Sequence, residues 1–305
     1  MIKRITLHQL RLIEALARSL NMTRAAEEMH MTPSAFSIQI KQLSESLGLP
    51  LHEQTGKKLR LTEAGRAAAS ASRDMLQRLD ALGMELAEMR GLERGELRLA
   101  MITTARYFAT RLIGDFCRDH PGIELVMEVV NREQMLERMA QNRDDLYIMG
   151  RVPEDMEVEA IPFIENQLVV VAAAGHKLCG ERDIDPSRLA DEPFILREPG
   201  SGTRQATERF FSSHGIAPPA RMTLGSDETI KQVAAAGLGL AVLSRHVLTL
   251  ELASGVLREL DVKGFPLRGQ WYVAHLKAKR LSPAATAFVD SLKHGQNRNI
   301  IVNLK

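Results

Sequence analysis

Residues 23–48, TRAAEEMHMTPSAFSIQIKQLSESLG, constrain the fold more than any other stretch of this chain. Three apolar residues near its start have the spacing of one buried helix face: Ala25, Ala26 and Met29. We expect Thr23 to cap this first helix. Thr32 followed by Pro33 marks a second helix start, because a hydroxyl caps the helix and Pro suits its first turn. The stretch therefore predicts two short helices joined by a tight break.

The second helix of this pair has two contrasting faces. Its apolar residues recur every three or four positions: Phe36, Ile40, Leu43 and Leu47. Its other side is rich in hydroxyls and weakly basic: Ser34, Ser37, Ile38, Lys41 and Ser44. Small hydroxyl side chains let a helix approach the major groove of DNA, and Lys can contact a phosphate. This pattern suits a DNA-reading helix, although an ordinary helical hairpin with a solvated face is the alternative.

The flanking segments extend this pair to a winged helix-turn-helix module over residues 1–62. Residues 6–19 predict a first helix with an apolar stripe of Leu7, Leu10, Ile13, Ala17 and Leu20, widened by Leu16. After Gly48, Leu49 and Leu51 are expected to enter the core. A turn signal at 55–57 and the alternating Leu59 and Leu61 predict a small β-wing.

The wing and its module are basic. Lys57, Lys58 and Arg60 lie at or near the predicted tip, where they suit DNA phosphates or the minor groove. A solvated basic loop is the alternative. Residues 1–62 hold nine Lys and Arg against five Glu, a net charge of +4, whereas the whole chain carries +2. A basic module on a slightly acidic body indicates a protein that binds double-stranded DNA at one end.

Residues 63–91 predict a long linker helix with an apolar seam. The seam residues recur mostly at intervals of four and three: Ala64, Ala68, Ala71, Met75, Leu79, Leu82, Leu86 and Met89. A helix of this length extends roughly 40 Å, which is too long to be buried on one small module. We therefore expect a homodimer through this helix, with packing against the rest of the same chain as the alternative.

From residue 92 to residue 305, strand-like and helix-like segments alternate. Strands are expected at 95–104, 123–131, 144–150, 167–176, 193–197, 221–226, 238–244 and 267–276, and helices at 106–119, 133–141 and 283–293. This alternation predicts an α/β fold with a mostly parallel sheet. The length suits two lobes, the first at about 92–162 with 267–305 and the second at about 163–266. The tail 295–305 is either a loose end or an added edge strand.

Several expected strands end in residues that bind anions. Hydroxyls and free amides at helix starts, with nearby Arg, are typical of anion sites, and parallel strands bring such ends together. The candidate ligand residues are Thr103, Thr104, Asn131, Arg132, Arg151, Arg197, Ser201, Gly202, Thr203, Arg204 and Ser226. They predict a small anionic effector, such as a carboxylate, phosphate or sulfur oxyanion. For 197–204 a capped turn is the alternative, and for Arg151 an ordinary surface position.

Other classes of function find little support in the sequence. No catalytic motif of the G-x-S-x-G or HExxH type occurs, and the two Cys are isolated. We therefore expect no catalytic residues, no metal site and no cofactor. The amphipathic start lacks the features of a signal peptide, and no apolar run reaches the length of a membrane span. These features predict a cytoplasmic protein that does not bind membranes.

With these motifs in place, the chain resembles the LysR-type transcriptional regulators over essentially its whole length. The resemblance rests on AAEEMHMTPSAFSIQIKQLSESLG, LTEAGR, the linker helix and the two lobes. It implies a winged helix-turn-helix regulator with a co-inducer domain like periplasmic solute-binding proteins. It also implies a tetramer built as a dimer of dimers, with RNA polymerase as a possible partner.

Within that family, five segments look most like the RuBisCO-operon regulators: ITTARYFA, NREQML, DDLYIMGR, REPGSGTR and LGSDETIKQVAAAGLGLAVLSRH. This implies an activator of carbon-fixation genes that senses a sugar phosphate, a phosphorylated acid or a similar metabolite. Regulation of sulfur or other anion metabolism is the alternative within the family. A solute-binding protein without DNA function is the alternative outside it.

The DNA-reading helix departs from the family pattern. Many members start it with Gln-Pro-Ala, but here the run is Pro33-Ser34-Ala35, and Ile38 stands where Arg is common. His52 and Gln54 replace the usual Phe and Arg of the wing. Base contacts of the usual Gln and Arg therefore do not transfer. We expect Ile38 to contact a thymine methyl group instead, beside hydroxyl contacts from Ser34 and Ser37.

Overall fold

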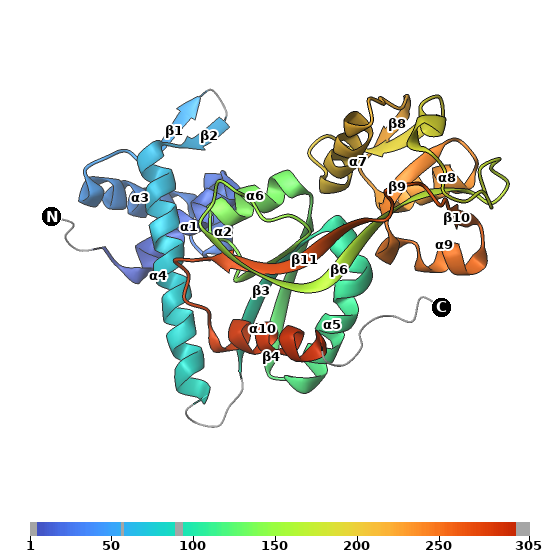
Figure 1. Cartoon of the computed structure of the whole chain (residues 1–305). Coiled ribbons are helices and arrows are strands. Elements are labelled where there is room, and N and C mark those ends of the chain that lie inside the picture. The colour runs from blue at the N-terminus through green and yellow to red at the C-terminus, as the bar shows by residue number, and fades with distance from the viewer. Residues whose placement is uncertain (1–4, 56–57, 89–93, 297–305) are drawn as a thin grey trace. The chain divides into compact units, whose positions relative to one another are not determined.

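The computed structural model describes residues 5–55, 58–88 and 94–296 (Figure 1). The chain folds into two compact units. The first comprises Met1–Arg94 with Gln141–Arg143, and the second comprises Gly95–Ala140 with Asp144–Lys305. Each unit has its own hydrophobic core.

The first unit is a winged helix-turn-helix followed by a long helix. Its elements are α1 (Leu7–Ser19), α2 (Met22–Glu28), α3 (Pro33–Leu47), β1 (His52–Thr55), β2 (Lys58–Leu61) and α4 (Glu63–Glu88). The strands β1 and β2 pair antiparallel as the wing. The core between the helices is apolar, with Leu12, Leu16, Phe36 and Ile40 fully buried. This burial holds the helix pair in place and leaves the other face of α3 free.

Local capping explains where these helices begin. At α1, the Gln9 amide donates to the Thr6 hydroxyl at 3.2 Å, and the Thr6 amide donates to the Gln9 side chain at 3.1 Å. At α3, the Thr32 hydroxyl accepts the Ala35 amide at 3.2 Å, with Pro33 in the first turn. The start predicted at Thr32 and Pro33 is therefore confirmed.

Three details of this module differ from the sequence prediction. Asn21, not Thr23, caps α2, because its side-chain oxygen accepts the amides of Thr23 and Arg24 at 3.0 and 3.1 Å. The buried face of α1 is rotated relative to the predicted stripe. Leu12 and Ala15 are buried, while Leu7 and Leu20 are about half exposed. Leu51 enters the core as expected, but Leu49 is exposed.

The helix α4 starts on the wing and continues beyond the three-helix core (Figure 1). Thr62 caps it by accepting the Gly65 amide at 3.0 Å. A Cβ at Gly65 would lie 1.8 Å from the Leu51 carbonyl oxygen, so only glycine fits there. The first turns pack on the module through Ala64 and Ala68, so these two seam residues are internal.

Further along α4, four seam residues remain substantially exposed in the single chain: Met75, Leu79, Leu82 and Leu86. The last predicted seam residue, Met89, lies outside the described residues. An exposed row of large apolar side chains on one helix is unusual for a monomer.

The second unit is built around one large sheet with helices on both sides. Its elements are β3 (Gly95–Ile102), η1 (Thr103–Ala105), α5 (Arg106–Asp119), β4 (Ile123–Val130), α6 (Arg132–Ala140), β5 (Leu146–Met149), β6 (Val158–Ala173), η2 (Pro186–Leu189), β7 (Phe194–Arg197), α7 (Gly202–Ser213), β8 (Ala220–Leu224), α8 (Asp227–Ala235), β9 (Leu240–Ser244), η3 (Arg245–Val247), α9 (Thr249–Ser254), β10 (Leu257–Glu259), β11 (Leu267–Leu276) and α10 (Pro283–Gln296). The strand order is β4-β3-β5-β11-β6-β9-β7-β8, and β10 pairs with β6. Within the described residues, no helix is long and apolar enough to cross a membrane.

The sheet is less parallel than the sequence predicts. Each lobe has a parallel trio, β4-β3-β5 in one and β8-β7-β9 in the other. Between the trios, β11 pairs antiparallel with β5 and β6, and β6 pairs antiparallel with β9. The predicted strand at 167–176 is only the second half of β6, which starts at Val158.

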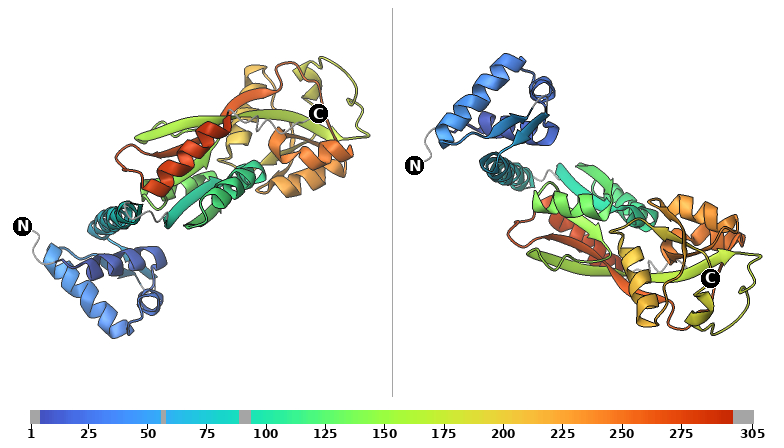
Figure 2. Two further views of the ribbon diagram at one scale, coloured as in Figure 1. Left: turned by 90° about the horizontal axis from the view of Figure 1, so that it is seen from below. Right: turned by 90° about the horizontal axis from the view of Figure 1, so that it is seen from above.

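The two long strands β6 and β11 run from the lobe that holds α6 and α10 into the lobe that holds α7, α8 and α9 (Figures 1 and 2). Each lobe keeps a separate core: Tyr147 and Met139 are buried in the first lobe, and Phe194 and Phe211 in the second. Two lobes joined by two strands place the ends of both parallel trios beside a common cleft.

The end of the chain is helical for longer than expected. The final helix α10 runs to Gln296 instead of ending at residue 293. The remainder of the tail, 297–305, lies outside the described residues.

Candidate effector pocket and DNA-facing helix

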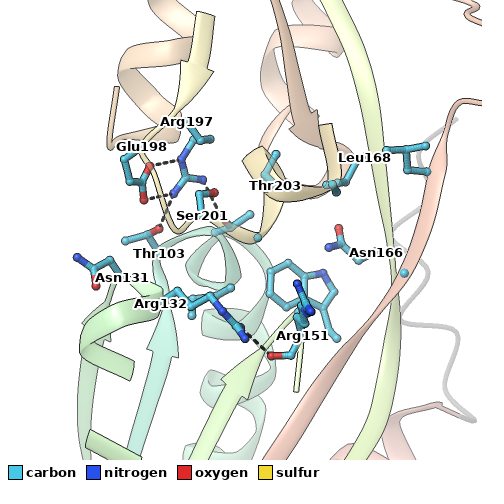
Figure 3. Close-up of a pocket in the computed structure, with 18 of the residues that line it drawn as sticks. Thr103, Asn131, Arg132, Arg151, Asn166, Leu168, Arg197, Glu198, Ser201 and Thr203 are labelled. Carbon is cyan, nitrogen blue, oxygen red and sulfur yellow. Dashed lines mark hydrogen bonds and ion pairs between the residues drawn. The ribbon is translucent and has the colours of Figure 1, made fainter. Parts of the chain in front are cut away.

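A cavity of about 210 Å³ lies in the second unit at the carboxyl ends of β3, β4, β5 and β7 (Figure 3). Residues from β6 and β11 line it as well. The lining residues are Ile102, Thr103, Thr104, Asn131, Arg132, Gly150, Arg151, Asn166, Leu168, Arg197, Glu198, Ser201, Gly202, Thr203, Ala206, Arg209, Leu267, Arg268, Gly269 and Trp271. Nine of the eleven predicted ligand residues are among them. The strand ends that the sequence singles out therefore meet around one cavity.

Arg197 lines this pocket, but all three nitrogens of its guanidinium already donate hydrogen bonds to other residues of the protein. Its Nε and Nη2 donate to the two carboxylate oxygens of Glu198 at 2.8 and 3.0 Å. Its Nη1 donates to Asp227 at 2.5 Å and to the Thr104 hydroxyl at 3.2 Å. Both Arg197 and Asp227 are buried. Thr104 in turn donates to Asp227 at 2.9 Å, which ties η1 of one lobe to α8 of the other.

The electrostatics of Arg197 follow from these contacts. Burial alone lowers the pKa of its guanidinium, but the hydrogen bond to Glu198 and the charge of Asp227 outweigh burial, and the net effect raises the pKa. Two carboxylates already neutralise this cation. Arg197 therefore holds the lobes together and has little charge to offer a ligand. The sequence predicts that Arg197 contacts the anion, and this geometry argues against that role.

The guanidinium of Arg132, in contrast to that of Arg197, has few hydrogen-bond partners. Its Nη1 donates to the main-chain oxygen of Arg151 at 2.8 Å. Among the described residues, no carboxylate lies within ion-pair distance of its guanidinium. Burial lowers the pKa of Arg132 and the neighbouring charge of Arg151 lowers it further, while the charge of Asp155 opposes both and has the smallest effect of the three. A half-buried cation without an ion-paired carboxylate favours an anion as its partner.

Three further arginines line the cavity, and their positive charges are balanced less completely than that of Arg197. Arg151 donates to the Gln205 side chain at 2.8 Å and to the very exposed Glu154 at 3.1 Å. Arg209 donates to the main-chain oxygen of Gln205 at 3.2 Å. Arg268 lies 3.6 Å from the exposed Glu165. Exposed ion pairs of this kind are weak, so the cavity keeps a positive potential.

The start of α7 adds to this potential. Ser201 occupies the cap position without a side-chain hydrogen bond to the first turn, and Ser201, Gly202 and Thr203 all line the cavity. The first-turn amides of a helix of this length carry partial positive charge. They lie on the same cavity as Arg132, so both features favour negative charge in the same space.

Several other predicted residues have structural partners of their own. Asn131 lines the cavity, but its side chain caps α6 by accepting the Gln134 amide at 2.9 Å. Thr103 lies near Arg197 Nη2, at 3.4 Å. Arg204 and Ser226 do not line the cavity. Arg204 turns to Glu208 at 2.7 Å and to the Arg197 main-chain oxygen at 3.0 Å, while Ser226 caps α8 through the Thr229 amide at 3.3 Å.

The sequence reasoning missed several lining residues, among them Asn166, Arg209 and Trp271. Arg209 follows Thr203 and Ala206 at three-residue intervals on α7, and this helical spacing could have indicated it. Trp271 alternates with Leu267 and Gly269 on one face of β11, but the sequence does not say which face meets the cleft. Within the described ranges, no three His, Cys, Asp or Glu side chains gather as metal ligands would.

On the first unit, the proposed DNA face of α3 is open. Ser34, Ser37, Lys41 and Ile38 are exposed, Ile38 to 53%. Such exposure is unusual for an isoleucine on a short helix whose other side is fully packed. Thr23, Thr32, Pro33 and, on β2, Arg60 are exposed as well. Lys57 lies outside the described residues, as does the side chain of Lys58.

Both units match models of known protein families. The model of the bacterial regulatory helix-turn-helix protein, lysR family, covers residues 7–66, and that of the LysR substrate binding domain covers residues 90–297. The RuBisCO operon transcriptional regulator of Acidithiobacillus ferrooxidans is 52% identical over 291 residues, which is 95% of this chain and 94% of that protein. The HTH-type transcriptional activator CmpR of Synechocystis is 46% identical, with 95% of each chain covered.

A solved structure matches the second unit. The CcmR regulatory domain of Synechocystis, in complex with 2-PG (2-phosphoglycolate), is 46% identical, with a TM-score of 0.65. The match covers 67% of this chain and 98% of that domain. Family models for both units and relatives aligned over nearly the full length agree with the fold. The chain belongs to the LysR family of bacterial helix-turn-helix proteins, and it is a transcriptional regulator and not an enzyme.

Proposed function

We propose that this regulator activates carbon-fixation genes in response to a small phosphorylated metabolite, such as 2-phosphoglycolate or a sugar phosphate. Two relatives at 46% and 52% identity over 95% of the chain support the target class, one named as a RuBisCO operon regulator and one as an activator. The ligand class is supported by the CcmR regulatory domain, whose structure contains 2-PG.

The observation that carries the ligand proposal is the guanidinium of Arg132, whose charge is opposed only by the weak influence of Asp155. The pocket contains a partly buried guanidinium without a carboxylate partner among the described residues, beside the uncapped start of α7. Removing a charge from water is costly unless it is paired. A phosphate or carboxylate is a chemically matched partner, because its oxygens accept from a guanidinium in a bidentate manner.

A thermal-shift panel tests this function on the full-length protein. It compares 2-phosphoglycolate, ribose phosphates, inorganic phosphate, glycolate, sulfate and sulfite. A ligand that binds only the folded state at 100 times its Kd stabilises the protein by about 2.7 kcal/mol. We expect phosphorylated acids or sugar phosphates to give the largest shift. Stabilisation by sulfate or sulfite alone would instead indicate a regulator of sulfur metabolism.

For DNA, we propose that residues 1–62 read promoter sequence and that the exposed face of α3 enters the major groove. Thr23, Thr32, Pro33, Ser34, Ser37, Ile38 and Lys41 would contact the site, and Lys57, Lys58 and Arg60 would contact its backbone. The exposure of Ile38 and the anchoring of α3 by Phe36, Ile40 and Leu43 support this orientation. Promoter DNA lies in the cytoplasm, where we place the protein.

Replacing Ile38 with Ala is expected to relax the preference for thymine at one position of each half-site. The methyl contact of Ile38 is lost, whereas phosphate contacts persist, so affinity should fall by about 1 kcal/mol at that base. Footprinting of substituted operators measures this. The matched control is Lys41→Ala, which should weaken all sequences alike and reduce the salt dependence. Unchanged preference at every base would rule out a base contact by Ile38.

We further propose that residues 63–91 form a dimerisation helix, that two such dimers form a tetramer, and that residues 92–305 sense the effector. A bound regulator at a promoter could then contact RNA polymerase. The support for the dimer is the exposed row from Met75 to Leu86 on α4. Four large apolar residues in one row provide enough area for a paired-helix seam.

Replacing Leu79 or Leu82 with Glu should disrupt this dimer, because a carboxylate would be buried in an apolar seam. Sedimentation is expected to show dissociation at concentrations where the wild-type protein is fully associated. The helical fold of α4 should survive, since Glu is a good helix former. Arg78→Glu, placed on the same helix outside the seam, serves as the control. An unchanged sedimentation profile in the seam variants would exclude this interface.

A further inference from the structure

Two direct contacts join the lobes beside the pocket, and they differ in strength. The first is the buried network of Arg197, Asp227 and Thr104 described above. The second is a single hydrogen bond from Arg151, in the loop after β5, to the side chain of Gln205 on α7 at 2.8 Å. Figure 3 shows the labelled Arg197 and Arg151 well apart around the cavity. Beside the cavity the lobes are therefore tied at two separate places, and away from its lining the Tyr107 hydroxyl of α5 donates to Glu228 of α8 at 3.4 Å.

Burial decides which of the two contacts opens first. The side chains of Arg197 and Asp227 are 5% and 1% exposed, whereas that of Arg151 is 40% exposed. Arg197 and Asp227 both belong to the second lobe, and the contact between the lobes is made by the buried Thr104 hydroxyl, which donates to Asp227 and accepts from Arg197. Separating the lobes here would leave this hydroxyl and its two charged partners short of hydrogen bonds in the interior. The Arg151–Gln205 bond has a neutral acceptor and adjoining solvent, so water can replace it at little cost. This difference favours opening of the cleft at Arg151 over opening at the Arg197 side.

We propose that Gln205 is a positioning residue, which holds the Arg151 guanidinium across the cleft and so controls entry and exit of the effector. Gln205 does not line the cavity, but Arg151 does. The Gln205 side chain therefore acts on the ligand through Arg151. The main-chain oxygen of the same residue accepts from Arg209, so one turn of α7 orients two pocket cations. This inference rests on the anionic effector of the proposed function.

Stopped-flow kinetics on the full-length protein with 2-phosphoglycolate test the proposal. Trp271 lines the cavity and is the one tryptophan of the sequence, so its fluorescence reports from the pocket itself. Calorimetry gives the Kd on the same samples without relying on this signal. The test variant is Gln205→Met, which keeps length and helix propensity but removes the acceptor.

We expect the association rate and the dissociation rate of Gln205→Met both to rise about fivefold. Loss of one neutral hydrogen bond should increase the fraction of protein molecules with an open cleft by about this factor. The Kd should stay within about twofold, since opening precedes entry and exit alike. In an Arg151→Met background, Gln205→Met should add nothing further. The control Gln232→Met, an exposed glutamine of α8 outside the pocket lining, should behave as the wild type.

Three results would overturn this role of Gln205: wild-type rates in Gln205→Met, a rise in the dissociation rate alone, or the full effect persisting without Arg151. The second would mean that Gln205 contacts the ligand directly. Absence of 2-phosphoglycolate binding by the wild-type protein in calorimetry would instead refute the proposed ligand, and this inference with it. The two failures are therefore distinguishable.

Discussion

Replacing Arg132 with Met is expected to weaken binding of 2-phosphoglycolate by roughly 30-fold or more without destabilising the ligand-free protein. Losing one partner of a desolvated charge pair costs about 2–5 kcal/mol of binding free energy. In the free protein, burial lowers the pKa of Arg132, which means that folding disfavours its charged form. Removing that charge should therefore leave the free energy of unfolding unchanged or slightly higher.

Calorimetric titration and thermal unfolding measure the two halves of this prediction on the same variant. Arg209→Met is the matched control, because Arg209 is exposed at the cavity and should contribute only a small part of the affinity. An Arg132→Met protein that binds 2-phosphoglycolate as tightly as the wild type would refute the assigned role. So would a clear loss of stability in the absence of ligand, which would indicate a structural role instead.

Replacing Arg197 with Met should have the opposite outcome. Asp227 would be left buried without its cation, and breaking a buried pair in this way costs about 3–5 kcal/mol. For a unit of this size, the midpoint of thermal unfolding should fall by roughly 10 °C. The change also removes the hydrogen bond that Arg197 donates across the lobes to the Thr104 hydroxyl.

Adding Asp227→Asn to Arg197→Met should restore part of this loss, since the unpaired charge is then removed. Thermal unfolding of the single and double variants gives the coupling between the two residues. Equal stability of Arg197→Met and the wild type would contradict the structural assignment. The two arginines face the same cavity, so their opposite responses separate ligand binding from support of the fold.

The sequence predicts best where the determinants are local. The start of α3 follows from Thr32 and Pro33, and the buried side of that helix follows from the spacing of Phe36, Ile40 and Leu43. The predicted cap of α2 is two residues late, because Asn21 and Thr23 are both good capping residues and only the path of the chain distinguishes them. For the same reason, the predicted stripe of α1 is off by part of a helical turn.

The sequence could not predict which distant segments pair as neighbouring strands. Alternating strands and helices indicate parallel strands, but nothing local states that β6 and β11 pair antiparallel through both lobes. The arginines illustrate the same limit. Arg197 and Arg132 both follow strand ends, yet Arg197 is neutralised by Asp227, thirty residues further along the chain. Only the fold shows which cation remains for a ligand.

Footprinting of the full-length protein on a RuBisCO-operon promoter, with and without 2-phosphoglycolate, tests the central claim most directly. The wild-type protein should protect a promoter site, and the ligand should change the extent of protection. Arg132→Met should protect the same site and show no change with ligand, because the DNA-binding unit is intact while the pocket has lost its free cation. Absence of protection by the wild type, or an equal ligand effect in both proteins, would contradict it.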